Sequence, residues 1–252
     1  MRLTHFIFLL FITTFFGCKD KPLGVSRIEG KQIPVADSII GDPSIEAYVK
    51  PFREGIKADL DSTLAYAPNT LSKSDGEFNT AIGNLMADAV YEQASPVFER
   101  RTGHKIDAVL LNYGGIRGLL PKGNVSKRTA YEIMPFENSI MVVTMKGSAI
   151  KDLMHYLLKA KAAHPISGLK LSMDADFKLV NATINNNPID ANKTYYVATS
   201  DYLFHGGDNM DFFKDNEGST LLNYKIRNAL IDYFIKKDTI NPKRDDRFIQ
   251  IK

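Results

Sequence analysis

Helix-like and strand-like segments alternate along this chain from Ser44 to its C-terminus, without a fixed repeat length. In some segments the apolar residues recur every three or four positions, and others are short runs rich in β-branched and aromatic residues. Interleaved segments of both kinds predict a mixed α/β or α+β domain and argue against an array of repeats. The 252 residues, of which 44% are hydrophobic, are enough for one large core or two small ones.

The positions of the individual elements follow from the same patterns. Helices are expected over residues 44–60, 80–101, 147–162 and 220–237, and Pro51 should kink or divide the first of them. Strands are expected over 105–112, 137–145 and 193–203, with a hairpin over 169–184 and a candidate edge strand over 27–35.

The first seventeen residues have the pattern of an export signal. A basic start precedes an apolar stretch over residues 6–16, which is shorter than the roughly 20 residues needed to span a bilayer. Cys18 follows Gly17 directly, and a lone cysteine at that place resembles the lipidation site of bacterial lipoproteins. Phe15 and Phe16 depart from the usual form of that site, so an ordinary signal peptide with a chance cysteine is the alternative.

These features divide the chain into a signal peptide (1–17), a lipidated Cys18 with a Pro- and Gly-rich tether (18–43) and one domain (44–252). We expect an exported lipoprotein that several acyl chains hold on a membrane, facing the periplasm or the cell surface. Cys18 is the only cysteine, which argues against a scaffold held together by internal disulfides. The 32 basic and 29 acidic residues are scattered, so neither a nucleic-acid track nor a polybasic membrane patch is expected.

Three short stretches carry residues suited to holding a ligand. An apolar run ends in NYGGIR (112–117), where the glycines permit close ligand approach and Arg117 offers a planar fork for phosphate or carboxylate oxygens. PFEN (135–138) places an aromatic ring behind a stiff proline, and DYLFHGGD (201–208) leads through a second glycine pair into Asp208. Taken singly, each of these stretches is most simply a turn or a packing element.

Together, and in this order, the stretches resemble the C-terminal, substrate-binding domain of 5'-nucleotidases. The pattern of that family is a helix with NLxADA, then NxGGIR, PFxN and DYxxxGGD, and NLMADA (84–89) supplies the first motif here. The resemblance covers the chain from about Ser44 onward. It implies a domain of layered mixed sheets flanked by helices.

The resemblance also implies a nucleoside pocket in which the base lies between two aromatic rings. By position these rings are Phe136 and Tyr202, and the second is more often phenylalanine in the family. Stacking should survive this exchange because tyrosine keeps the π face. The other matching positions are Asn112 for the base, Arg117 for the phosphate and Asp208 for the ribose hydroxyls, with Gly115, Asn138 and Gly168 lining the same pocket.

One departure from the family concerns phosphate binding. Family members commonly carry a second phosphate-binding arginine shortly before the NLxADA helix, but this chain reads KSDGEFNTAIG (73–83) there. Lys73 is the nearest cation in that stretch. We therefore expect the phosphate to be held more weakly, or by a different group.

The chain also lacks the motifs of the metal-dependent half of a 5'-nucleotidase. Full-length members have a metallophosphoesterase domain whose two metals activate water, with Asp-x-His, Asn-His-Asp/Glu and Gly-His-x-His motifs. No Gly-x-Ser-x-Gly elbow or Walker loop offers another route to catalysis. We expect no catalytic residue and no metal on this chain, and two divalent metals on a separate metallophosphoesterase chain. The histidines that follow the signal peptide are His104, His155, His164 and His205, and none stands in such a motif.

Two hypotheses about function remain open at this point. In the first, the chain is the nucleoside- or nucleotide-binding half of an extracytoplasmic 5'-nucleotidase system, which the matching Asn112, Arg117 and Asp208 favour. In the second, the fold serves as an interaction or structural module that no longer binds nucleotide, which the missing arginine favours. Catalysis by a carboxylate pair of Asp201 and Asp208 is a weaker third possibility.

Overall fold

A computed structural model of the protein describes residues 24–36 and 38–251; the predicted signal peptide and Cys18 lie outside the described residues. The chain divides into two compact units, Met1–Tyr48 and Val49–Lys252. The candidate edge strand over 27–35 is not formed, and these residues are irregular and exposed. Pro34 lacks an N–H group for a strand ladder, which disfavours pairing at this place. No helix within 24–36 or 38–251 has both the length and the apolar character needed to cross a membrane.

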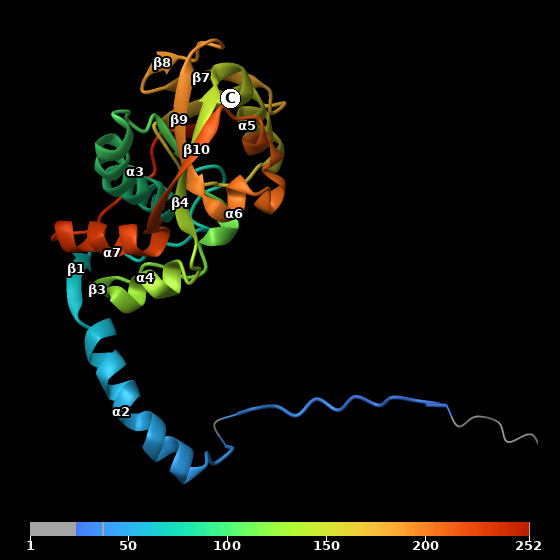
Figure 1. Ribbon diagram of the computed structural model, residues 1–252, viewed down its shortest axis with the longest axis vertical. Coiled ribbons are helices and arrows are strands. Elements are labelled where there is room, and N and C mark those ends of the chain that lie inside the picture. The colour runs from blue at the N-terminus through green and yellow to red at the C-terminus, as the bar shows by residue number, and fades with distance from the viewer. Residues whose placement is uncertain (1–23, 37, 252) are drawn as a thin grey trace, which may run out of the picture. The chain divides into compact units, whose positions relative to one another are not determined.

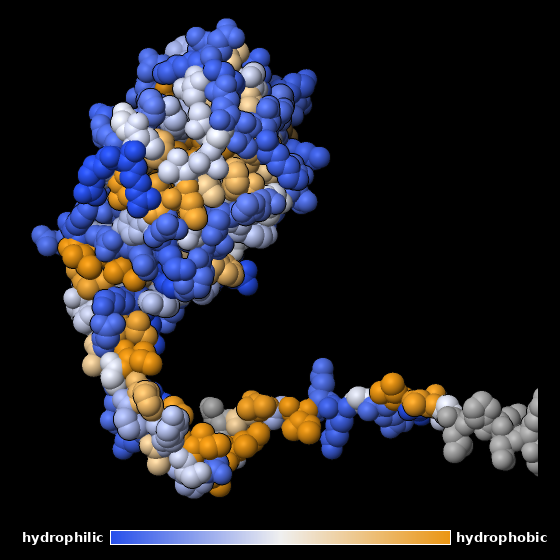
Figure 2. All heavy atoms as spheres, in the orientation of Figure 1, coloured by the Kyte–Doolittle hydropathy of each residue, from blue (hydrophilic) through white to orange (hydrophobic). Residues whose placement is uncertain are grey.

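Helix α2 (Pro43–Leu60) confirms the predicted first helix, but Pro51 does not divide it. The carboxylate of Asp42 accepts the backbone N–H of Ser44 at 2.8 Å and so satisfies a donor at the first turn. No residue of α2 is buried, and apolar side chains such as Ile45 and Ile56 are exposed. Figure 2 shows orange, hydrophobic spheres on the surface of this helix.

A five-stranded mixed sheet forms the centre of the second unit, with strands in the order β10-β4-β9-β2-β5. β2 and β9 are parallel, and the other neighbours are antiparallel. β4 is buried on both faces, because Ile140 and Val142 pack into one core cluster and Met141 and Val143 into another. The strands are β2 (Ala108–Leu110), β4 (Ser139–Lys146), β5 (Ile166–Ser167), β9 (Thr194–Ser200) and β10 (Gly218–Lys225).

Helices cover both faces of this sheet. α3 (Ala81–Thr102), α4 (Lys127–Ile133) and α7 (Ile226–Lys236) contribute to one core cluster, and α5 (Gly147–Ala160) contributes to the other. Figure 1 shows α3 and α5 on opposite sides of the strands. The layered mixed α/β architecture predicted from the sequence is therefore confirmed.

Two smaller sheets complete the second unit. β6 (Leu169–Met173) and β7 (Leu179–Ile184) form the predicted hairpin, which β8 (Asn187–Pro188) and the parallel strand β11 (Phe248–Gln250) extend. β1 (Thr63–Ala67) pairs with β3 (Gly123–Ser126). The remaining short elements are α6 (Asp201–Phe204) and the 3-10 turns η1 (Tyr113–Gly115), η2 (Gly207–Asn209) and η3 (Asp211–Lys214).

Two predicted elements have different boundaries in the structure. The strand expected over 193–203 ends at Ser200, whose hydroxyl accepts the backbone N–H of Leu203 and starts α6. The closing helix expected over 220–237 begins instead as β10, and helix α7 starts only at Ile226. The first half of that segment is a strand because β4 offers it a partner, and such tertiary pairing overrides local helical spacing.

One edge of the central sheet collects the ends of four strands. β2 and β9 are parallel, so their carboxyl ends both lie at this edge. β4 is antiparallel to β9, with Ile140 opposite Ser200, so β4 begins here. β10 is antiparallel to β4, with Lys225 opposite Ser139, so β10 ends here. The segments that follow β2, β9 and β10 and the one that precedes β4 therefore meet in one place.

Candidate functional site

A cavity of about 340 Å³ lies where these segments meet, within the size range of small-ligand sites. Its walls come from the segment after β2, the segment before β4 and the segment after β9. The structure thus brings together seven of the eight pocket residues predicted from the sequence. The cavity is lined by Asn112, Gly114, Gly115, Arg117, Phe136, Asn138, Tyr202 and Asp208.

The eighth predicted residue, Gly168, lies in a different depression, which Asp245 and Arg247 also line. Its backbone has φ +73°, and a Cβ would stand 2.2 Å from the carbonyl oxygen of Asp107. Glycine is required there by backbone packing between β2 and β5. The prediction that Gly168 lines the same pocket is therefore not met.

The NYGGIR turn is built by its own backbone. After β2 the chain forms η1, where the Gly115 N–H donates to the carbonyl of Asn112 at 3.0 Å. The Arg117 N–H donates to the carbonyl of Ile133 at 2.8 Å, which ties the end of the turn to α4. A Cβ on Gly115 would lie 2.8 Å from the side-chain oxygen of Asn112. The second glycine therefore leaves room for the Asn112 side chain at the cavity wall.

Asp208 is the centre of the polar contacts in the cavity. Its carboxylate accepts the side-chain N–H of Asn112 at 2.6 Å and the hydroxyl of Tyr202 at 2.9 Å. The hydroxyl of Tyr156 donates to its backbone carbonyl at 2.9 Å. The hydrogen bond to Asp208 raises the pKa of Tyr202. An ionised carboxylate has about four lone-pair positions, so two remain for hydroxyl groups of a ligand.

The two aromatic rings predicted to hold a base are both accessible from solvent. Phe136 is 40% exposed and Tyr202 is 47% exposed. The ring of Tyr202 packs on the backbone of Gly207, where an added Cβ would stand 2.4 Å from the ring. The guanidinium of Arg117 lies 5.8 Å from the centroid of the Phe136 ring. A cation and an aromatic face are therefore adjacent on the same wall.

Lys73 contacts the NYGGIR turn from outside the cavity lining. Its ammonium group donates to the carbonyl of Ile116 at 3.0 Å and lies 4.6 Å from the centroid of the Tyr113 ring. These contacts place a second positive charge one residue away from Arg117 along the turn. The stretch that lacks the expected arginine thus still supplies a cation to this turn.

His164 supports the turn from beneath. Its Nδ1 accepts the backbone N–H of Tyr113 at 3.2 Å, and Tyr156 packs edge-on against its ring. Burial lowers the pKa of His164, although the carbonyl of Leu111 and the charge of Asp208 act in the opposite direction. A neutral imidazole is the form that can accept this hydrogen bond. His164 is therefore a packing residue that positions the NYGGIR turn.

Asp201 connects the two loops that carry the aromatic rings, a role that sequence reasoning missed. Its carboxylate accepts the side-chain N–H of Asn138 at 3.1 Å, the backbone N–H of Ser139 at 3.1 Å and the backbone N–H of Tyr202 at 2.8 Å. Asp208 accepts from other donor groups, although Tyr202 bonds to both carboxylates, through its backbone N–H to Asp201 and through its hydroxyl to Asp208. The sequence signal that could have indicated this role is the position of Asp201 as the first residue of the DYxxxGGD motif.

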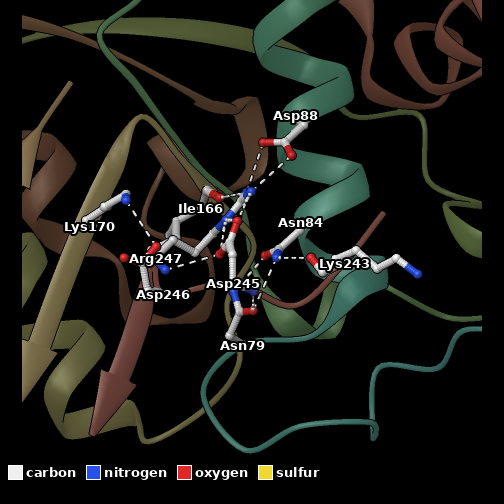
Figure 3. A network of polar contacts seen from close by, with 9 residues as sticks. All are labelled: Asn79, Asn84, Asp88, Ile166, Lys170, Lys243, Asp245, Asp246 and Arg247. Carbon is white, nitrogen blue, oxygen red and sulfur yellow. Dashed lines mark hydrogen bonds and ion pairs between the residues drawn. The ribbon is translucent and has the colours of Figure 1, made fainter. Parts of the chain in front are cut away.

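The NLMADA motif lies outside the cavity and holds the C-terminal segment against α3 (Figure 3). Asp88 accepts from both terminal nitrogens of Arg247, at 2.9 and 3.1 Å. Arg247 also donates to Asp245 and to the carbonyl of Ile166. Asn84 donates to the carbonyl of Lys243 at 2.9 Å. This motif therefore stabilises the fold rather than contacting a ligand in the cavity.

Within residues 24–36 and 38–251, no group of three or more His, Cys, Asp or Glu side chains is placed to hold a metal ion.

Comparisons with known proteins give the same fold. The family model for the "5'-nucleotidase, C-terminal domain" matches residues 62–215, more than half of the chain. The solved structure of a 5'-nucleotidase precursor from Thermus thermophilus has a TM-score of 0.69 at 22% identity, covering 82% of this chain and 42% of that one.

Several curated proteins are similar in sequence, among them two bacterial proteins. Protein UshA of Yersinia enterocolitica is 28% identical over 192 residues, which cover 73% of this chain and 33% of that protein. The cell wall protein Lmo0130 of Listeria monocytogenes is 27% identical over 241 residues, which cover 82% of this chain and 30% of that protein. The chain therefore spans less than half of the length of each relative.

Proposed function

The chain belongs to the family of 5'-nucleotidase C-terminal domains, and we propose that it is the nucleotide-binding half of an exported 5'-nucleotidase system. One observation carries the proposal: seven residues predicted to contact a nucleotide, from three distant segments, line a single cavity. The base stacks between Phe136 and Tyr202, Asp208 binds the ribose hydroxyls and Arg117 faces the phosphate.

The geometry around Asp208 supports a sugar diol as one part of the ligand. Asn112 and Tyr202 each donate to one carboxylate oxygen, which holds the carboxylate in one orientation. Each oxygen keeps a lone pair for a further donor. Two adjacent hydroxyl groups, as on a ribose, match that arrangement.

Arg117 and Lys73 support an anionic group as a second part of the ligand. Arg117 is exposed beside the Phe136 ring, and Lys73 is anchored on the neighbouring carbonyl of Ile116. A guanidinium fork binds phosphate oxygens with two hydrogen bonds, whereas an ammonium group acts as a point charge. Phosphate binding in this proposal therefore depends mainly on Arg117.

Hydrolysis in this system comes from a metallophosphoesterase on a separate chain, with two divalent metals that activate the attacking water. More than half of the length of these two relatives lies outside the region that matches this chain. Export and lipidation at Cys18 belong to the same proposal. The similarity to a protein named for the cell wall supports export.

Calorimetric titration of the purified protein with adenosine and AMP tests the pocket. We expect a Kd on the order of 10 μM to several mM, since association offsets much of the gross interaction energy. Phe136→Ala and Asp208→Ala should weaken adenosine and AMP alike. Arg117→Ala should weaken AMP roughly 10- to 150-fold, from a charge-assisted hydrogen bond of about 1.5–3 kcal/mol, and spare adenosine.

Arg100→Ala is the matched control, because Arg100 is an arginine on α3 that does not line this cavity. It should leave both affinities unchanged. Unchanged AMP binding in Arg117→Ala would show that the phosphate is not held where we propose.

The alternative function is an interaction or structural module without nucleotide binding. The stretch 73–83 favours it, because this stretch contains no arginine that could bind a phosphate. Absence of any binding at millimolar adenosine or AMP would select this alternative.

A further inference from the structure

Arg227 is a buried cation beside the loop that carries Phe136. It stands at the second position of α7, directly after the end of β10, and is only 4% exposed. It does not line the cavity, and neither its sequence position nor the family motifs point to it. Its surroundings nevertheless connect it to the proposed base site.

The Arg227 guanidinium binds three successive residues of that loop. Its Nη1 donates to the carbonyl oxygens of Pro135 at 3.1 Å and Phe136 at 3.3 Å. Its Nη2 forms an ion pair with the carboxylate of Glu137. The plane of the guanidinium lies over the ring of Tyr131, 4.0 Å from its centroid. One side chain therefore contacts Phe136 and the residues on both sides of it.

The charges around Glu137 strengthen this attachment. The hydrogen bonds from Arg227 and then from Lys225 lower the pKa of Glu137 to about 2, so it is ionised at neutral pH. Lys225 also donates to the backbone carbonyl of Glu137 at 3.1 Å. On the other side of the loop, Asp201 binds Asn138. The loop is thus held between the start of α7 and the end of β9.

Burying this arginine is unfavourable for stability by itself. Among the described residues its Nε is buried without a hydrogen-bond partner. Its ion-pair partner Glu137 is 66% exposed, and ion pairs with a solvent-exposed member contribute little to stability. What an apolar residue cannot replace is the set of donors to the Pro135 and Phe136 carbonyls.

Phe136 needs such support because the loop has no regular secondary structure and the ring is 40% exposed. A ring that moves freely must be ordered when a ligand binds, and this ordering reduces affinity. We propose that Arg227 is a positioning residue for base stacking, which holds the Phe136 loop in its binding conformation. The inference rests on the proposed function of the pocket.

A tryptophan reporter tests the positioning without any ligand. The chain contains no tryptophan, so Phe136→Trp places a single tryptophan at the site, whose emission can be excited separately from that of the 11 tyrosines. In the double variant Phe136→Trp with Arg227→Met, time-resolved fluorescence anisotropy should show a larger amplitude of nanosecond motion of the tryptophan than in Phe136→Trp alone. Arg100→Met in the same background is the matched control and should change nothing. An unchanged amplitude in folded Arg227→Met protein overturns the inference.

A double-mutant cycle with adenosine tests the functional part. Arg227→Met should weaken adenosine about 5- to 50-fold, within the range of losing one stacked base contact. In the Phe136→Ala background, Arg227→Met should weaken adenosine binding by less than about twofold, because the ring that Arg227 positions is absent. Equal losses in both backgrounds would indicate a general structural effect and overturn the inference.

The measurements also distinguish a variant that does not fold, failure of the proposed function, and failure of this inference alone. If Arg227→Met does not fold, Arg227→Lys keeps the charge but not the fork, and the same two readouts apply with smaller changes in the same direction. If the wild type binds no adenosine, the proposed function fails and the base-positioning role fails with it. If the wild type binds adenosine and the Arg227 variants bind it equally well, this inference fails alone.

Discussion

Replacing Asp88 with alanine should destabilise the protein by detaching the C-terminal segment from α3. In the native structure the Asp88 carboxylate accepts two hydrogen bonds from Arg247, at 2.9 and 3.1 Å (Figure 3). The Arg247 side chain is only 13% exposed, so losing a partner leaves part of a buried charge uncompensated.

The expected magnitude follows from what remains around Arg247. Removing one partner of a fully buried ion pair costs about 3–5 kcal/mol. Here Asp88 is 33% exposed, and Arg247 keeps its contacts to Asp245 and to the carbonyl of Ile166. We therefore expect a loss of roughly 1.5–3 kcal/mol in the free energy of unfolding, below the fully buried case. At about 2–4 °C per kcal/mol, the Tm should fall by roughly 3–12 °C.

Urea denaturation and calorimetry of the wild type and Asp88→Ala measure this loss. Lys170→Met is a nearby control, because the Lys170–Asp246 pair is exposed at 47% and 67% and should contribute at most about 1 kcal/mol. The free energy of unfolding of Asp88→Asn, which keeps one acceptor oxygen, should lie between the values of the wild type and Asp88→Ala. A change below about 0.5 kcal/mol in Asp88→Ala would refute the reasoning, because such a value is typical of an unconnected surface site.

Three further predictions concern pH, anchoring and catalysis. Burial places the pKa of His164 in the folded protein below its ordinary value of 6.5, so the unfolded chain binds a proton more readily than the folded one. The contribution of His164 to the free energy of unfolding should therefore be full above pH 6.5 and should decrease as the pH falls toward the folded-state pKa. Denaturation at several pH values should show this slope, which His164→Asn should reduce. Cys18→Ser should shift the protein out of the membrane fraction or block its processing, and an unmodified mature N-terminus at another residue would contradict lipidation. With Mn²⁺, Zn²⁺ or Mg²⁺ the purified chain should release no phosphate from AMP, and turnover that follows the protein through repurification would contradict a separate catalytic chain.

The sequence by itself was sufficient to predict the loops of the cavity. NYGGIR, PFEN and DYLFHGGD were assigned to one pocket through their resemblance to a known family, and local geometry accounts for two of their glycines. Gly207 lies under the Tyr202 ring and Gly115 makes room for Asn112, and both requirements arise within a few residues along the chain. The helices α3 and α5 were likewise predicted close to their observed boundaries, although only α5 has a single buried face, since residues 81–87 of α3 are all buried.

Only the tertiary structure decided which segments pair and which side chains support the loops. The segment 218–225 is a strand because β4 is available beside it, and that pairing brings Arg227 to the Phe136 loop. Gly168 has the residue type of a pocket glycine, yet the carbonyl of Asp107 is what requires it. Contacts such as that between Arg227 and Phe136 join residues about ninety positions apart, and no local pattern records them. Local conformational demands can be read from neighbouring residues, whereas long-range contacts exist only once the strands have been brought together.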